Sequence, residues 1–357
     1  MDILNRYVLK KFLKTFLFVV GVMVLVVVVI DFTEKNHKFI QNKLSTSDIL
    51  GYYYGFIPYI ISLVTPITAF IATVYVTAQL SQRTELIAIL SSGKSFIYII
   101  KSFFIGSLII AISSFLLNGW IIPHLNKDRV AFEVMYIKGP YFFSDKNVHF
   151  KIDENSYLYL ERYDNNMEIG YNVTIENFED NELKAKLFAR QIIWKNDLEK
   201  WRLKSWRTRE LYDKGEEINT GFELDTTLLV SPSDFDNNYR LSETFTNNEL
   251  NEFINLQQLR GADDTNIYKI EKYMRIAQPF TVILLVILGV VIASRKSRQG
   301  KGYLIALGFS FAFAFIISFV MSRAFAENGS LAPILAIWLP NIIFSFLTAY
   351  LYKLAPK

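Results

Sequence analysis

The segment whose spacing comes closest to a reactive-site motif is Ala88 to Ser95, which reads A-x-x-x-x-G-K-S, a relaxed form of the phosphate-binding loop pattern. Such a loop needs glycine-rich backbone after a buried strand, so that its N–H groups can surround the phosphates. Here the intervening residues are Ile89, Leu90, Ser91 and Ser92, which continue a helical pattern. We therefore predict no nucleotide site in this chain, and we expect any ATP that drives it to be bound by another protein.

Other residue types that carry chemistry are absent or scattered. The sequence has no cysteine, so disulfides and thiolate chemistry are excluded. Its three histidines, His37, His124 and His149, lack the i, i+4 spacing of a helical metal pair. Arg323 and Glu327 stand four residues apart, which indicates an ion pair on one helix rather than an acid–base couple. We predict no metal, no cofactor and no catalytic residues in this chain.

The apolar residues are concentrated in six runs, each about the length that crosses a bilayer. We place these spans at about residues 12–32, 52–80, 96–122, 276–294, 303–325 and 332–351. A basic interfacial segment at 5–14 precedes the first run, and Asp31 to Lys35 follows it without a small-residue cleavage site, so we predict an uncleaved span. Pro58 and Pro66 predict a kink in the second run.

The charges are divided unevenly between the apolar frame and residues 123–272. That central block holds 20 Lys and Arg against 28 Asp and Glu, a net charge of −8. The short basic segments, which are Arg6 to Lys14, Arg83 with Lys94, Arg295 to Lys301, and Lys353 with Lys357, fall on one side of a six-span chain. The positive-inside rule makes that side the cytoplasm, so both termini are predicted to be cytoplasmic and the acidic block extracytoplasmic.

The central block is too long for a loop and too polar for lipid, and its pattern predicts a folded β domain. Apolar and polar residues alternate at 148–152, 156–163, 171–178, 182–194, 200–211 and 220–230, with turn residues between these segments. Successive antiparallel strands of this kind build a sandwich, a jelly roll or an open barrel. The aromatic side chains form either an ordinary sheet core or the lining of an apolar interior. After Pro232 the pattern predicts a capped helix from Thr246 to Arg260, ended by Gly261, and a second helix from Thr265 into span four.

Residues 81–93 predict a short amphipathic helix between spans two and three. Ser81 is the expected N-cap, Glu85 lies in the first turn, and Gly93 supplies the stop. The apolar stripe, which includes Leu86, Ile89 and Leu90, predicts a helix that lies on the membrane surface or in a groove of another protein.

The order of these features resembles the lipopolysaccharide-export permease family, LptF and LptG. The resemblance covers the whole chain, although no single motif in it is highly specific. It rests on Arg6-Tyr7, Pro66, the Ser81 to Gly93 segment, Arg275-x-x-Gln278-Pro279 and Trp338-Leu339-Pro340. Tyr159 to Arg162 and Arg190 to Arg202 look closer to LptG than to LptF.

The resemblance implies six transmembrane helices, three plus three, around an inserted periplasmic β-jelly-roll-like domain. The expected domains are an N-terminal transmembrane half at 1–122, the periplasmic domain with its helical link at 123–272, and a C-terminal transmembrane half at 273–357. It also implies a bacterial inner-membrane location and a heterodimer with a second six-span permease. The other implied partners are a cytoplasmic ABC ATPase dimer, a periplasmic jelly-roll bridge protein and lipopolysaccharide, with no nucleic acid. The 81–93 segment would be the coupling helix on the ATPase, through Arg83, Glu85, Leu86, Ile89, Leu90 and Gly93.

Two further sets of site residues follow from this topology. Lys35, Lys38, Arg275 and Arg323 are all expected near the outer membrane surface, where cations from separate spans could grip phosphates or merely reach for lipid headgroups. The outer end of span one departs from the family expectation, because it begins with Asp31 and Glu34. In the β domain we take the parity of Leu158 and Leu160 as the inward face of a lipid conduit.

The predicted function is that of a permease subunit that extracts lipopolysaccharide from the inner membrane. The lipid then passes to a periplasmic bridge for delivery to the outer membrane. One alternative is a membrane-anchored sensor or scaffold with an extracytoplasmic β domain, and another is the permease of a different ABC-type lipid or lipoprotein extractor. A membrane enzyme would need convergent acids, an activated nucleophile or a metal cluster, and the sequence presents none of these.

Overall fold

The computed structural model describes residues 2–138, 146–153, 155–165, 167–179, 182–212, 215–228, 230–235, 239–259, 265–294 and 301–354. The chain divides into two compact units. The helical unit comprises residues 1–132, 242–250 and 266–357, and the sheet unit comprises residues 133–241 and 251–265. We describe each unit separately.

Six helices of the helical unit are long and apolar enough to cross a membrane, which confirms the six predicted spans. They are α1 (Ile3–Gln41), α2 (Thr46–Gln82), the continuous run of α4 (Phe96–Leu116), the π-helical turn η1 (Leu117–Ile121) and α5 (Ile122–Phe132), then α7 (Asn266–Ala293), α8 (Lys301–Glu327) and α9 (Pro333–Lys353). A further π-helical turn, Glu133–Lys138, follows α5. Most of these helices are longer than the apolar runs because polar residues at their ends also adopt helical backbone.

The start of α2 shows why a helix exceeds its apolar run. The Asp48 backbone N–H donates to the Ser45 hydroxyl at 3.2 Å, and the Ser45 N–H donates to the Asp48 carboxylate at 3.1 Å. This capping box satisfies two backbone donors that a helix start leaves free. The helix therefore begins six residues before the apolar run that was predicted from Tyr52.

The predicted cap at Ser81 is wrong. Ser81 lies in the last turn of α2, where it is buried, and the short helix α3 (Glu85–Ser91) begins four residues later. Thr84, with φ 59°, adopts the left-handed conformation that separates α2 from α3. Gly93, with φ 82°, lies just beyond the end of α3, as its predicted stop requires.

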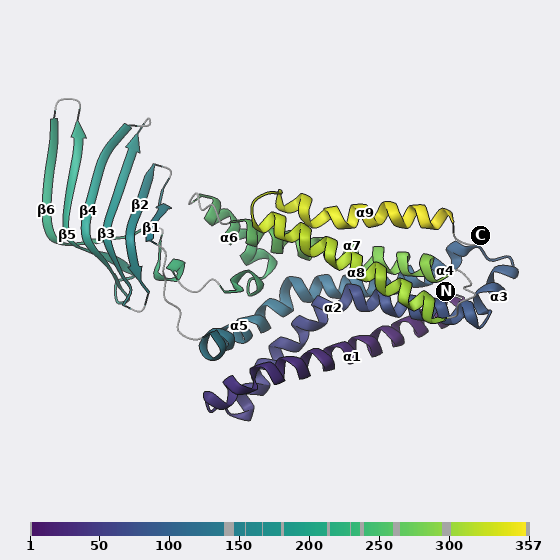
Figure 1. The fold of residues 1–357 in the computed structure, drawn as a ribbon. Coiled ribbons are helices and arrows are strands. Elements are labelled where there is room, and N and C mark those ends of the chain that lie inside the picture. The colour runs from purple at the N-terminus through teal and green to yellow at the C-terminus, as the bar shows by residue number, and fades with distance from the viewer. Residues whose placement is uncertain are drawn as a thin grey trace. The chain divides into compact units, whose positions relative to one another are not determined.

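The centre of the helical unit is formed by α2 and α7, the two spans with the largest share of buried residues in their apolar windows. Figure 1 shows both chain termini and α3 at one end of this unit, which we call the terminal end. The opposite end, where α5 meets residues 242–250, is the linker end. The termini and the short helix therefore lie on the same side of the bundle, as the six-span prediction requires.

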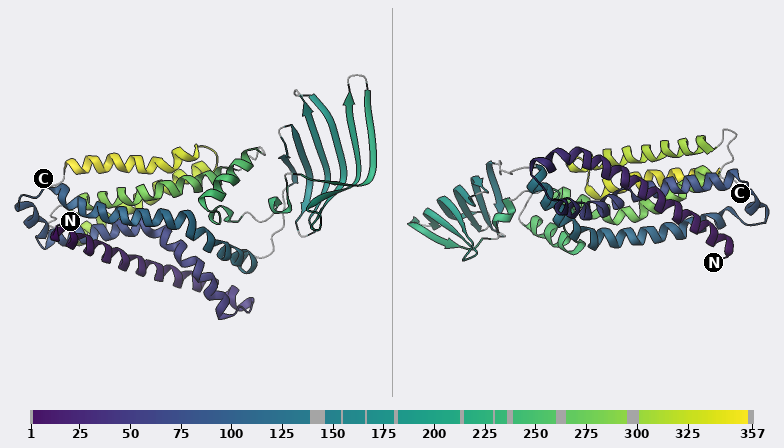
Figure 2. Two further views of the ribbon diagram at one scale, coloured as in Figure 1. Left: turned by 180° about the vertical axis from the view of Figure 1, so that it is seen from behind. Right: turned by 90° about the horizontal axis from the view of Figure 1, so that it is seen from below.

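The sheet unit contains one antiparallel sheet whose strands follow one another in chain order. The strands are β1 (Lys146–Lys151), β2 (Ser156–Asp164), β3 (Ile169–Glu179), β4 (Glu182–Lys195), β5 (Lys200–Tyr212) and β6 (Gly215–Thr226), which form a single layer in the two views of Figure 2. The fold class, six spans with an inserted antiparallel β domain, is confirmed. Among the described strands, the connection is that of a meander. The predicted turn residues Asn166, Asp180, Asn181, Asp213 and Lys214 lie outside the described residues.

One face of the sheet is covered by its own apolar cluster. Leu158 and Leu160, both about as buried as any residue of the sheet, pack with Val173, Ala189, Trp201 and the return segment that carries Val230 and Phe235. The Trp201 indole N–H donates to the Val230 carbonyl at 2.6 Å, and Tyr163 stacks on Phe235. The part of the sheet that packs against Val230 and Phe235 therefore has an ordinary packed core.

Further along the strands, the alternation of buried and exposed side chains shifts by one residue. The buried positions of β2 are Leu158, Leu160 and then Tyr163. In β3 and β5, the residues Asn172 (φ 50°) and Ser205 (φ 51°) adopt left-handed backbone at the corresponding level. Such irregularities bend a strand and increase its twist, so simple parity does not hold along the whole sheet.

The predicted helix after Pro232 is α6 (Asn247–Leu259). It starts with a second capping box, in which the Thr246 N–H donates to the Glu249 carboxylate at 2.7 Å. That hydrogen bond, with help from Lys127, lowers the pKa of Glu249 to about 2. Arg260 and the predicted stop at Gly261 lie outside the described residues, as do Arg295, Lys296, Arg298 and Lys357, which entered the topology prediction.

Candidate functional site

A cavity of about 710 Å³ lies at the linker end of the helical unit, between α2, the η1–α5 turn, α7 and α8. Much of its wall is apolar, and polar groups enter it at a few points. The polar and charged side chains that line it are Tyr59, Ser62, Asn118, Asn126, Glu243, Glu271, Arg275, Gln278, Thr281, Arg323 and Glu327. An apolar cavity with a few convergent polar groups is the usual form of a ligand site.

Arg275 lines this cavity but is already engaged within the protein. Its side chain is 5% exposed, and its Nε donates to Glu271 at 2.7 Å. Its terminal nitrogens donate to the Phe245 carbonyl at 2.7 Å and the Ser242 carbonyl at 3.1 Å. Arg275 therefore attaches the segment before α6 to α7. Its predicted headgroup role stays a prediction that this geometry does not favour.

A second buried arginine, Arg129 of α5, reaches the same segment. Its Nη2 lies 2.5 Å from Glu243, its Nε donates to Asn126 at 2.9 Å, and its guanidinium lies 4.1 Å from the centre of the Tyr59 ring. A Cβ at Gly55 of α2 would meet the backbone and side chains of α5 at 2.6–3.0 Å, so only glycine allows this close approach. Sequence reasoning missed the Arg129–Glu243 pair, because 114 residues separate its members.

Arg323 differs from both of these arginines. Its Nε donates to Glu327, one turn further along α8, at 2.7 Å, and the two side chains are 42% and 40% exposed. An ion pair this exposed contributes at most about 1 kcal/mol. The Arg323 guanidinium can therefore exchange its partner for an anionic group that enters the cavity.

The predicted convergence of four cations is reproduced only in part. Arg275 and Arg323 line the same cavity, whereas Lys35 and Lys38 do not. The Lys35 ammonium lies 2.7 Å from Asp31 and 4.6 Å from the centre of the Tyr52 ring, so an acid and an aromatic cluster hold it. The Lys38 side chain is exposed on α1.

At the terminal end, α3 turns its predicted apolar stripe into the bundle. Leu86 and Ile89 are buried in the core shared by α1, α2, α4 and α7, and Leu90 packs against that core. Ile87, Ala88 and Arg83 are exposed. Glu85 accepts a hydrogen bond from the Tyr7 hydroxyl at 3.2 Å, and Arg83 lies 4.0 Å from it. The surface left for a partner is therefore the face opposite Leu86 and Ile89.

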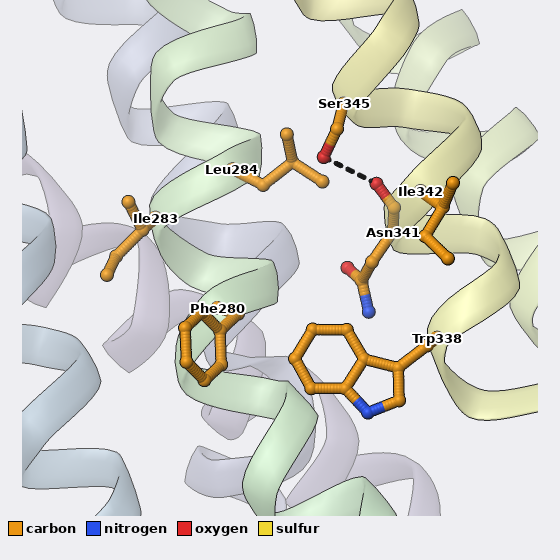
Figure 3. Close-up of a pocket in the computed structure, with 7 residues that line it drawn as sticks. All are labelled: Phe280, Ile283, Leu284, Trp338, Asn341, Ile342 and Ser345. Carbon is orange, nitrogen blue, oxygen red and sulfur yellow. Dashed lines mark hydrogen bonds between the residues drawn. The ribbon is translucent and has the colours of Figure 1, made fainter. Parts of the chain in front are cut away.

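A smaller pocket of about 250 Å³ lies between α7 and α9 (Figure 3). Phe280, Ile283 and Leu284 come from α7, and Trp338, Asn341, Ile342 and Ser345 come from α9. The Asn341 side-chain oxygen accepts from Thr281 at 2.8 Å, and the Ser345 hydroxyl donates to the Asn341 carbonyl at 2.7 Å. Because these polar groups have partners within the protein, the pocket offers a ligand mainly apolar surface.

Within the part of the chain that the structure describes, no group of three His, Cys, Asp or Glu side chains could hold a metal ion. The A-x-x-x-x-G-K-S segment has α3 at residues 88–91 and follows another helix rather than a strand. The N–H groups of Ala88, Ser92 and Gly93 donate to carbonyls three or four residues earlier instead of forming a phosphate cradle.

Comparison with known proteins adds independent findings. Residues 6–354 match the family model described as lipopolysaccharide export system permease LptF/LptG. The chain is 18% identical over 370 residues to the lipopolysaccharide export system permease protein LptG of Escherichia coli K12, with 98% of this chain and 97% of the relative covered. The protein of the same name from Escherichia coli O6:H1 matches at the same identity and coverage.

Proposed function

The chain belongs to the lipopolysaccharide export system permease LptF/LptG family, and from this premise we propose that it extracts lipopolysaccharide from the inner membrane and passes it to its β domain. Membership makes the chain a multi-pass inner-membrane permease in an ABC-type export complex, a transport subunit rather than an enzyme. Both relatives carry the LptG name, which favours LptG over LptF.

The cavity at the linker end is the observation that carries the proposal. It combines apolar walls suited to acyl chains with one exposed guanidinium, that of Arg323, suited to a phosphate. The acyl chains would then lie on the apolar face of the sheet that carries Leu158 and Leu160. They would occupy the part of that face beyond the core formed with Val230 and Phe235. The lipid then continues to a periplasmic jelly-roll bridge protein.

The proposed topology has both termini and α3 in the cytoplasm and the β domain in the periplasm. Two observations support it. Both termini and α3 share one end of the helical unit (Figure 1), and the basic residues Arg6, Lys10, Lys11, Lys14 and Lys94 belong to segments at that end.

The partners proposed for this chain are a second six-span permease and a cytoplasmic ATPase dimer. The ATPase would dock on α3 beside Glu85, where a carboxylate and the exposed Ile87 suit a groove edged with basic residues. ATP would be bound and hydrolysed by that partner alone.

Reconstitution tests the proposal. The full-length chain, the second permease and the ATPase are placed in vesicles that contain lipopolysaccharide. We expect lipopolysaccharide to stimulate ATP hydrolysis and to leave the vesicles only when ATP is present. An assembled complex that hydrolyses ATP without lipid stimulation and releases no lipid would instead favour a sensor or scaffold.

A further inference from the structure

Four prolines, Pro58, Pro66, Pro279 and Pro340, lie inside the described helices α2, α7 and α9, and each lacks the N–H that would donate to a carbonyl one turn earlier. In a helix, the N–H of each residue donates to the carbonyl four residues earlier. Pro66 in α2 and Pro340 in α9 therefore deprive the carbonyls of Ser62 and Ala336 of their donors. Within a membrane no water replaces those donors, so another group must do so.

The Ser62 carbonyl receives its hydrogen bond from a different helix. The side-chain amide of Gln278, on α7, donates to it at 2.7 Å. The Gln278 oxygen accepts from Asn118 at 3.0 Å, and the Asn118 oxygen accepts from the Ser62 hydroxyl. Asn118 lies in the π-helical turn η1. One closed set of hydrogen bonds thus joins α2, η1 and α7 one turn before Pro66.

The Ala336 carbonyl is satisfied in the same way by an unrelated pair of helices. The hydroxyl of Ser322, on α8, donates to it at 2.5 Å, and Ser322 is 4% exposed. Most other hydroxyls of these spans, such as those of Thr73 and Ser318, donate to a carbonyl of their own helix. At two of the four prolines, Pro66 and Pro340, a side chain from a neighbouring helix thus donates to the carbonyl that the proline leaves free.

We infer that Gln278 and Ser322 replace the backbone donors missing at Pro66 and Pro340, and that they attach each proline-containing helix to the adjoining span. The first of these contacts also shapes the candidate site, because Ser62, Pro66, Asn118 and Gln278 all line the cavity. Ser322 does not line it. Only the contact at Pro66 therefore bears on the cavity.

Double-mutant cycles on the purified full-length chain test this inference. Gln278→Leu and Ser322→Ala each lower the thermal unfolding midpoint, by about 2–4 °C. A Pro66→Ala or Pro340→Ala change restores a backbone N–H, so the same substitution in that background costs less than half as much. An equal loss in both backgrounds would overturn the inference for that pair.

Ser318→Ala is the matched control for Ser322→Ala, because the Ser318 hydroxyl serves its own helix. Its effect should not depend on Pro340. If Gln278→Leu yields no folded protein, the inference requires that Gln278→Leu with Pro66→Ala does fold, and a failure of both would refute it for Pro66.

A second measurement rests on the proposed function. Gln278→Leu should also lower the lipopolysaccharide retained by the purified complex, whereas Ser322→Ala should not. Because the unfolding cycles need no lipid, they stand or fall independently of the transport function. Unchanged retention with Gln278→Leu would show that the Gln278–Ser62 contact does not shape the lipid site.

Discussion

The arginines at the linker end differ in how many acceptors they already have. Arg129 and Arg275 are buried, and each donates to several groups of the protein, whereas Arg323 has one partially exposed partner, Glu327. A buried arginine that loses its position leaves a carboxylate uncompensated, at a cost of about 3–5 kcal/mol. Arg323 can change partners at little cost, so it is the arginine that can meet a mobile ligand.

Arg323→Ala should weaken lipopolysaccharide binding by about ten-fold or more, since a desolvated charge-assisted bond contributes roughly 1.5–3 kcal/mol. Arg323→Lys should recover only part of the loss, because the ammonium lacks the planar fork that grips a phosphate. The measurement is lipid retained on the purified complex at low salt and matched expression.

Glu327→Gln is the control for this prediction, because it removes the partner of Arg323 and leaves the guanidinium in place. Lipid retention should be kept or increased in that variant. Unchanged retention in Arg323→Ala would place the headgroup site elsewhere. Arg275→Ala does not test the headgroup site, because it also leaves the Glu271 carboxylate without its buried ion-pair partner.

The sequence identified the cationic residues near the ends of the spans. It did not show which of them already donate to acceptors within the protein. That property depends on acceptors far away in the chain, such as the Ser242 carbonyl for Arg275 and Glu243 for Arg129. Lys35 was expected to meet lipid, but its neighbour Asp31 and the Tyr52 ring hold it. Pairing between distant segments has no local sequence signal.

At the scale of elements, α3 shows how a correct helix can be given the wrong exposed face. The stripe of Leu86, Ile89 and Leu90 was expected to meet either membrane or a partner's groove. It packs against the spans of the same chain instead. The spacing of apolar residues identifies the apolar face of a helix, but it does not identify the surface that packs against that face.

The exposed face of α3 should therefore carry the ATPase contact. Ile87→Asp should abolish co-purification of the ATPase and leave the unfolding midpoint of the permease almost unchanged. Leu86→Ala should lower the free energy of unfolding by about 2–5 kcal/mol, because it removes a buried side chain. Affinity purification and thermal unfolding of the two variants separate these effects. An Ile87→Asp protein that retains the ATPase would contradict this orientation.

Glu85 lies at the edge of the exposed surface of α3, where its side chain is partly exposed and accepts a hydrogen bond from Tyr7. We expect Glu85→Lys to uncouple ATP hydrolysis from lipid release, since it reverses the charge next to the docking groove. Tyr7→Phe is the matched change, because it removes the hydrogen bond and keeps the carboxylate for the ATPase.

The spans and strands themselves were predictable because both depend on local patterns. Apolar runs of about 20 residues and alternating segments of 5–13 residues locate helices and strands without knowledge of tertiary contacts. Their ends were less predictable, as with Ser45, whose capping box extends α2, and Ser81, which is inside α2. The slip in alternation near Asn172 and Ser205 was likewise invisible, because one left-handed residue leaves composition unchanged.

At the scale of the whole molecule, the six spans differ widely in how much of their surface is buried by the rest of the chain. In their most apolar windows, only 17% of residues are buried in α1 and 22% in α8, against 61% in both α2 and α7. Exposed apolar residues on α1 and α8 include Leu17, Phe18, Leu25, Phe309 and Phe313. A span that packs little within its own chain has the most surface available for the proposed second permease.

We therefore expect α1 and α8 to contact that permease, and the chain allows a clean test because it contains no cysteine. Single variants Phe18→Cys and Phe313→Cys, labelled with a photoreactive maleimide in membranes that contain the assembled complex, should capture the second permease. Phe346→Cys on α9 is the matched control, since Phe346 is 73% exposed, close to the 71% of Phe18. Lipid alone should react there, because α9 has more of its window covered by this chain than α1 or α8. Capture of the second permease from position 346, with none from positions 18 and 313, would move the dimer interface to the exposed face of α9 and leave α1 and α8 facing lipid.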